Sequence, residues 1–129
     1  MKRLHISFNV SDLEKSIDFY STLFNQPPLV LRPDYAKWML DDPRINFVLE
    51  HKPEHPGFSH AGIQVEEQQQ LQPIFERMKT AEAPYLPEGV TTCCYHKSEK
   101  SWTSDPDGVL WEAFFTHHDT EARGAEADY

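Results

Sequence analysis

The sequence predicts an α+β fold made of two βαβββ modules, which place curved sheets around a shared cleft with helices on the outside. Residues 4–10 alternate between apolar and polar side chains. Residues 59–65 repeat that pattern, so His60 falls where His5 fell 55 residues earlier. In each half, a run with helical spacing and several short strand-like segments follow. Such an internal repeat constrains the fold more than any single propensity does.

The first module is expected over residues 1–50 and begins with a half-buried strand. Over residues 4–10 the apolar side chains share one face, and His5 points to the other face. Residues 11–14 have the form of a capping box that begins at Ser11, and apolar residues at helical spacing continue to Phe24. The sequence therefore predicts a strand followed directly by a helix.

Three strands are expected after this helix, because short apolar segments alternate there with turn-forming residues. The strand-like segments are residues 28–31, 35–40 and 45–50. The turns between them, residues 32–34 and 41–44, each contain Asp and Pro.

The second module is expected over residues 58–116 and repeats this order. Its helix is predicted from about residue 68 to residue 81, with Pro73 tolerable only in the first turn. The final two strands are separated by residues 104–108, Ser-Asp-Pro-Asp-Gly, which are typical of a turn. Four strand-like segments are expected after the helix: residues 85–86, 91–96, 101–103 and 109–115.

The remaining residues, 117–129, lack an apolar period and are predicted to form a flexible tail. Residues 1–116 are accordingly expected to form one domain, which agrees with a chain of 129 residues.

Composition argues against several kinds of partner. The formal net charge is −9 and no cluster of Lys or Arg interrupts it, so nucleic acid is not an expected partner. No apolar run approaches the roughly 18 residues of a membrane span, and the first ten residues alternate too much for a signal peptide. A reducing, cytoplasmic location is expected, because an adjacent thiol pair is prone to oxidation.

Both cysteines of the chain are adjacent, as Cys93 and Cys94. Neighbouring Cα atoms lie about 3.8 Å apart, below the roughly 4.4–6.8 Å usual for a relaxed disulfide. Two adjacent thiolates can chelate one thiophilic metal or metalloid, which favours a binding role. The alternative is that both are small buried hydrophobic residues in a strand.

Three potential metal ligands stand on three predicted strands: His5, His60 and Glu112. A single strand histidine is more often structural than a ligand, but the equivalent places of the two histidines favour a shared role. Glu112 is the lone charge in an apolar strand, where a carboxylate needs a partner. Two imidazoles and a carboxylate are typical of non-haem Fe(II) sites with open positions, and also accommodate Zn, Mn, Ni or Co. The remaining histidines lack this repeat and are expected in loops or near the tail.

These motifs make the chain resemble the vicinal oxygen chelate superfamily, the glyoxalase/bleomycin-resistance/dioxygenase fold. The resemblance covers residues 1 to about 116 and rests on His5 and on residues 12–20, 60–65 and 105–112. More narrowly, residues 33–44 and 91–95 resemble the organoarsenical carbon–arsenic lyases and the related cadmium-induced proteins. The adjacent thiols are the discriminating motif.

The resemblance implies that His5, His60 and Glu112 bind Fe(II), and that Cys93 and Cys94 capture a trivalent organoarsenical, either methyl or aryl. It implies O2-dependent cleavage of the carbon–arsenic bond to inorganic As(III), which amounts to arsenic detoxification. Two thiolates can replace the exchangeable oxygens on arsenic and leave its carbon substituent free. A homodimer is possible within this family.

Consecutive side chains in a regular strand point to opposite faces, so a bulge or loop is expected at Cys93 and Cys94 if both reach one cleft. Residues 97–100 are predicted to form either a polar loop that moves in a lid-like step or a solvated turn. A cation such as Lys100 lowers the pKa of a nearby thiol, but the sequence does not establish that proximity.

Two other functions remain open. The thiols, alone or with a histidine, could sequester Cd(II) or As(III) without turnover. Alternatively, the fold could support glyoxalase, thiol-transferase or dioxygenase chemistry on an organic substrate.

Overall fold

The computed structural model describes residues 1–93 and 96–119, with side chains described outside 85–99 and 117–119. Two compact units make up the chain. The N-terminal unit is Arg3–His60, and the C-terminal unit is Met1–Lys2 together with Ala61–Tyr129. Their mixture of strands and helices confirms the α+β class.

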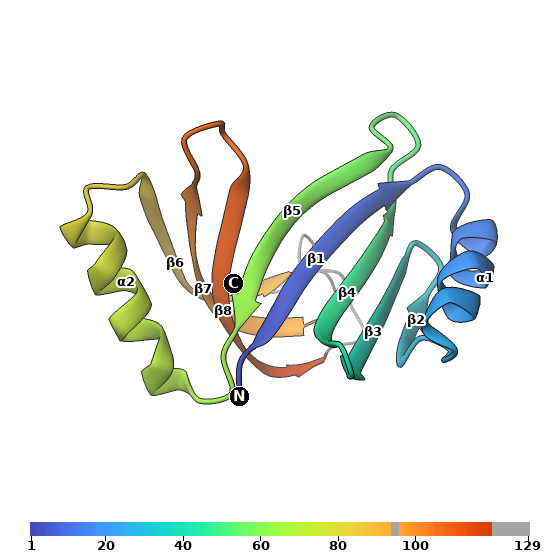
Figure 1. Cartoon of the computed structure of the whole chain (residues 1–129), viewed down its shortest axis with the longest axis horizontal. Coiled ribbons are helices and arrows are strands. Elements are labelled where there is room, and N and C mark those ends of the chain that lie inside the picture. The colour runs from blue at the N-terminus through green and yellow to red at the C-terminus, as the bar shows by residue number, and fades with distance from the viewer. Residues whose placement is uncertain (94–95, 120–129) are drawn as a thin grey trace. The chain divides into compact units, whose positions relative to one another are not determined.

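The N-terminal unit contains the predicted order of strand, helix and three strands (Figure 1). Its strands are adjacent in the order β2-β3-β4-β1, with β1 parallel to β4 and the other pairs antiparallel. The elements are β1 (Arg3–Val10), α1 (Leu13–Phe24), β2 (Val30–Arg32), β3 (Tyr35–Asp41) and β4 (Arg44–His51).

Helix α1 is capped one residue later than the sequence predicted. Asp12, in an extended conformation, is the N-cap, and its side chain accepts a 3.0 Å hydrogen bond from the backbone N–H of Lys15. The expectation that the capping box begins at Ser11 was therefore wrong. At the other end Asn25 adopts a left-handed conformation with φ of 54°, and its N–H donates to the carbonyls of Ser21 and Thr22.

Aromatic side chains fill the space between α1 and its sheet. Trp38 and Leu49 are fully buried. The ring of Phe47 lies 4.7 Å from Tyr20 and 5.0 Å from Phe24 between centroids. Side chains alternate between the two faces of a strand. The face of the sheet opposite α1 therefore carries polar residues, His5 among them.

The C-terminal unit repeats the order. β5 (Gly57–Gln64) begins in the N-terminal unit and leads into a short 3₁₀ helix, η1 (Gln68–Gln70), and then into α2 (Leu71–Thr80). Pro73 lies in the first turn of α2, as predicted. The strands that follow lie beside β5 in the order β5-β8-β7-β6 (Figure 1) and are β6 (Tyr85–Cys93), β7 (His96–Ser104) and β8 (Leu110–Asp119).

Two expectations about this unit were wrong. The predicted strands 85–86 and 91–96 belong to one strand, β6, which ends at Cys93, while His96 opens β7 directly opposite Cys93. The predicted mobile loop 97–100 lies inside β7. β7 is hydrogen-bonded to β6 on one side and to β8 on the other. This pairing stabilises a strand whose polar residues would not by themselves favour one.

The turn predicted for residues 104–108 is present between β7 and β8. Asp105 accepts hydrogen bonds from the backbone N–H groups of Asp107 and Val109, each at 2.9 Å. β8 continues through Asp119, three residues into the segment predicted as tail, and residues 120–129 lie outside the described residues. Over the described ranges, no helix is long and apolar enough to cross a membrane.

Candidate metal centre

His5 lies on β1 with 3 % of its surface exposed. Its Nδ1 is 3.2 Å from both the backbone and the side-chain oxygen of Asn46, the residue directly opposite on β4. Both oxygens are acceptors, so Nδ1 carries the proton and donates it. In the neutral ring, Nε2 then presents a lone pair, which is the arrangement that a metal-binding histidine requires.

His60, on β5, faces His5. The two Nε2 atoms lie 3.1 Å apart, and the ring centroids lie 5.1 Å apart. The Nδ1 of His60 is 3.0 Å from the hydroxyl of Ser59. That hydroxyl can accept a hydrogen bond from Nδ1–H, in which case both Nε2 atoms carry a lone pair. Alternatively it can donate a hydrogen bond to Nδ1, which allows a hydrogen bond between the two rings.

The spacing of the two histidines fits a shared cation. Two nitrogens that each bind one ion at about 2.1 Å and at right angles lie about 3.0 Å apart. The observed 3.1 Å between the Nε2 atoms of His5 and His60 matches this value. A cation would select the first of the two proton arrangements at Ser59, because both lone pairs would then point at the ion.

Glu112 lies on β8 and is 6 % exposed. The Nζ atom of Lys100 lies 3.5 Å from its Oε2, and Lys100 is also buried, with 5 % exposed. The same Nζ lies 5.8 Å from the ring centroid of Trp102, the residue directly opposite Glu112 on β7. The carboxylate therefore has the charged partner that its burial demands.

The structure corrects the location expected for Lys100. The sequence suggested a loop, whereas Lys100 lies on β7 and contacts Glu112. The register across the β7–β8 turn could have indicated this, since it places Trp102 opposite Glu112 and Lys100 two residues away on the same face. The effect of Lys100 on the thiols, whose side chains lie outside the described residues, stays a prediction.

Sequence reasoning also missed buried polar residues on the sheet face that carries His5. Lys37 is 3 % exposed and Glu50 is 7 % exposed. The ladder places Lys37 opposite Val48, and Val48 opposite Ser7. The Nζ atom of Lys52 lies 3.0 Å from the Glu50 carboxylate. Buried charges are uncommon away from functional or paired settings, so this face is chemically specialised.

The predicted thiol ligands cannot be placed. The backbone of Cys93 ends β6, but its side chain lies outside the described residues, and so does all of Cys94. Their role as substrate ligands, and the bulge or loop expected there, remain predictions.

The fold agrees with a comparison against protein-family models. Residues 2–113 match the Glyoxalase/Bleomycin resistance protein/Dioxygenase superfamily, and the chain belongs to this superfamily. Solved structures show the same fold. A superfamily member from Vibrio splendidus 12B01 matches with a TM-score of 0.61 at 20 % identity, covering 90 % of this chain and 99 % of that one.

Curated relatives place the chain more narrowly. A trivalent organoarsenical cleaving enzyme of Bacillus sp. (strain MD1) is 44 % identical over 121 residues, which is 90 % of this chain and 74 % of the relative. The cadmium-induced protein CadI of Mycobacterium tuberculosis is 34 % identical over 126 residues, covering 97 % and 83 %. The resemblance predicted from the motifs is thus confirmed.

Proposed function

We propose that this protein cleaves the carbon–arsenic bond of trivalent organoarsenicals in a reaction that uses Fe(II) and O2 and leaves inorganic As(III). The observation that carries the proposal is the histidine pair, with Nε2 atoms 3.1 Å apart and each Nδ1 beside an oxygen. Relatives named as trivalent organoarsenical cleaving enzymes supply the substrate class.

His5, His60 and Glu112 are the proposed ligands of the ion. Support for Glu112 comes from the β5–β8 ladder, in which Gly62 is directly opposite Glu112. His60 is two residues before Gly62 and shares its face of β5. Two neutral imidazoles and one carboxylate form a facial set that suits Fe(II) and also accepts Ni, Co, Mn or Zn. Bound Fe(II) would supply the capacity to activate O2 at its open positions.

Cys93 and Cys94 are the proposed substrate ligands. Each thiol would form a sulfur–arsenic bond and lose its proton, while one hydroxide leaves arsenic and takes that proton as water. Two such exchanges convert an organoarsenous acid into a dithiolate that retains its carbon substituent. Holding this carbon in a fixed place beside the metal would favour cleavage of its bond to arsenic.

Other residues of the chain position these groups. Asn46 holds the proton of His5 on Nδ1, and Ser59 can do so for His60. Lys100 contacts one oxygen of Glu112, which orients the carboxylate. The protonation states of the two histidine ligands thus depend on hydrogen bonds to neighbouring residues, and the orientation of Glu112 depends on its ion pair with Lys100.

Release of arsenite from methylarsenous acid tests the proposal. Protein purified and loaded with Fe(II) without oxygen should release arsenite only after O2 is admitted. His5→Ala and the Cys93→Ser, Cys94→Ser double variant should each lose this activity. Absence of O2-dependent arsenite from the iron-loaded protein would rule out the enzyme proposal. Retained activity in the cysteine variant would rule out thiol capture.

A second candidate is sequestration of Cd(II) or As(III) without turnover. The adjacent thiols and the relatives named cadmium-induced proteins favour it. Calorimetric titration with Cd(II) would detect it as stoichiometric binding that Cys93→Ser abolishes and His5→Ala leaves intact. If both candidates fail, the third is an enzyme of this fold acting on an organic substrate.

A further inference from the structure

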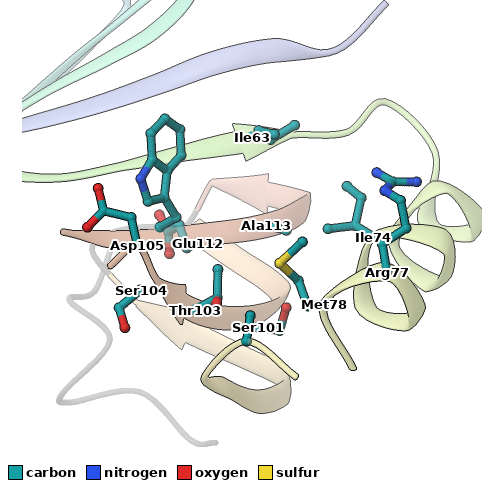
Figure 2. Close-up of a pocket in the computed structure, with 12 residues that line it drawn as sticks. Ile63, Ile74, Arg77, Met78, Ser101, Thr103, Ser104, Asp105, Glu112 and Ala113 are labelled. Atoms are coloured by element: carbon teal, nitrogen blue, oxygen red, sulfur yellow. The ribbon is translucent and has the colours of Figure 1, made fainter. Parts of the chain in front are cut away.

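The C-terminal unit contains a cavity of about 310 Å³ between α2 and its sheet (Figure 2). Ala113 and Ser101 line it, and their side chains alternate along the strands with those of Glu112 and Lys100. Glu112 borders the cavity as well, so the cavity adjoins the strand that carries this proposed metal ligand. The apolar wall is contributed by both α2 and the strands: Ile63, Ile74, Met78, Trp111 and Ala113.

The internal duplication explains why the cavity exists. In the N-terminal unit, one ladder row joins Phe8, Leu49 and Ala36 beneath α1. The equivalent row beneath α2 joins Ile63, Ala113 and Ser101. At the equivalent positions Ala113 stands in place of Leu49, and Ile63 stands in place of Phe8. The side chains of this row therefore fill less space.

The next row shows a larger difference. Beneath α1 it joins Ile6, Phe47 and the fully buried Trp38. The equivalent row beneath α2 begins at Ala61 and ends at Thr103, with Trp111 between them. The indole of the second row thus lies on the middle strand, and the position equivalent to Trp38 is taken by the smaller Thr103, whose side chain lines the space.

We infer that this cavity is a binding site for a small, uncharged aromatic molecule of one or two fused rings with one hydrogen-bonding group. A dry cavity of about 150 Å³ lined by apolar side chains can bind benzene, and ligand pockets begin at about 300 Å³. The apolar walls match a ring, and the hydroxyls of Ser101 and Thr103 provide polar groups at the sheet.

The inference does not rest on the proposed arsenical chemistry, and 5-fluoroindole observed by ¹⁹F NMR tests it on the full chain. Wild-type protein should give a saturable shift. Ala113→Leu and Ile63→Phe, which copy residues of the N-terminal unit, should each weaken binding by about tenfold or more. Lys79→Ala, at an exposed position on α2, should leave the affinity within about twofold.

His5→Ala separates this site from the metal centre and should retain binding of the probe. Two filling variants are used because either one could overpack the unit, and the NMR spectrum of each verifies folding. No saturable shift with wild-type protein up to the solubility limit of the probe would overturn the inference. So would binding that persists in both folded filling variants, or binding that His5→Ala abolishes.

Discussion

Lys100 and Glu112 form a buried ion pair across neighbouring strands, with the Nζ atom 3.5 Å from Oε2 and side chains only 4 % and 5 % exposed. A buried carboxylate without a charged partner is strongly destabilising, so Lys100 stabilises Glu112 where it lies. In the proposed centre, the lysine holds one carboxylate oxygen and the other oxygen can bind the ion.

Lys100→Met should therefore destabilise the metal-free protein by about 3 kcal/mol, because one charge of a buried pair is left uncompensated. Adding Glu112→Gln to this variant should recover part of the loss. Urea unfolding of both variants and of the wild type measures the coupling. Asp41→Asn is a control at an ion pair whose carboxylate is 86 % exposed, and it should cost less than about 1 kcal/mol. An equal loss in Lys100→Met and Asp41→Asn would contradict the role of burial.

Asn46 should control metal affinity through His5. Asn46→Ala removes one of the two oxygens within 3.2 Å of the His5 Nδ1, and affinity for Ni(II) or Co(II) should fall by about tenfold. Asn46→Asp keeps an oxygen acceptor and should lose less. Competition with a chelating dye measures both constants. Unchanged affinity in Asn46→Ala would show that the backbone carbonyl alone orients the ring.

Trp38 is expected to be the most sensitive position of the N-terminal core. It is fully buried and packs edge-on against Phe24 and Tyr20, with ring centroids 5.9 Å and 6.3 Å away. Trp38→Ala should lower the free energy of unfolding by about 3–5 kcal/mol. Phe19→Ala, at a position 62 % exposed on α1, should change it by less than about 1 kcal/mol. Similar losses would mean that the aromatic cluster is not the main source of stability.

The N-cap of α1 can be located by mutation. Asp12→Ala should destabilise the fold by about 1 kcal/mol, because the N–H of Lys15 loses its 3.0 Å acceptor. Ser11→Ala should have a smaller effect, since Ser11 is outside the helix. Thermal unfolding measures both, and a larger loss at Ser11 would restore the cap predicted from the sequence.

Much of this fold follows from local sequence patterns. Alternation in residues 4–10 and 59–65 predicted β1 and β5 and identified His5 and His60 as equivalent positions. Apolar spacing predicted α1 and α2, and Pro73 marked the first turn of α2. These signals are readable because side-chain direction repeats every two residues in a strand and about every 3.6 residues in a helix.

The tertiary structure alone decided which distant residues meet. It continued β6 to Cys93, placed residues 97–100 inside β7, and brought Lys100 to Glu112. It also brought the Nε2 atoms of His5 and His60 to 3.1 Å and left a cavity beneath α2. These outcomes depend on the register between strands and on how volumes fill an interface, which local periodicity does not specify.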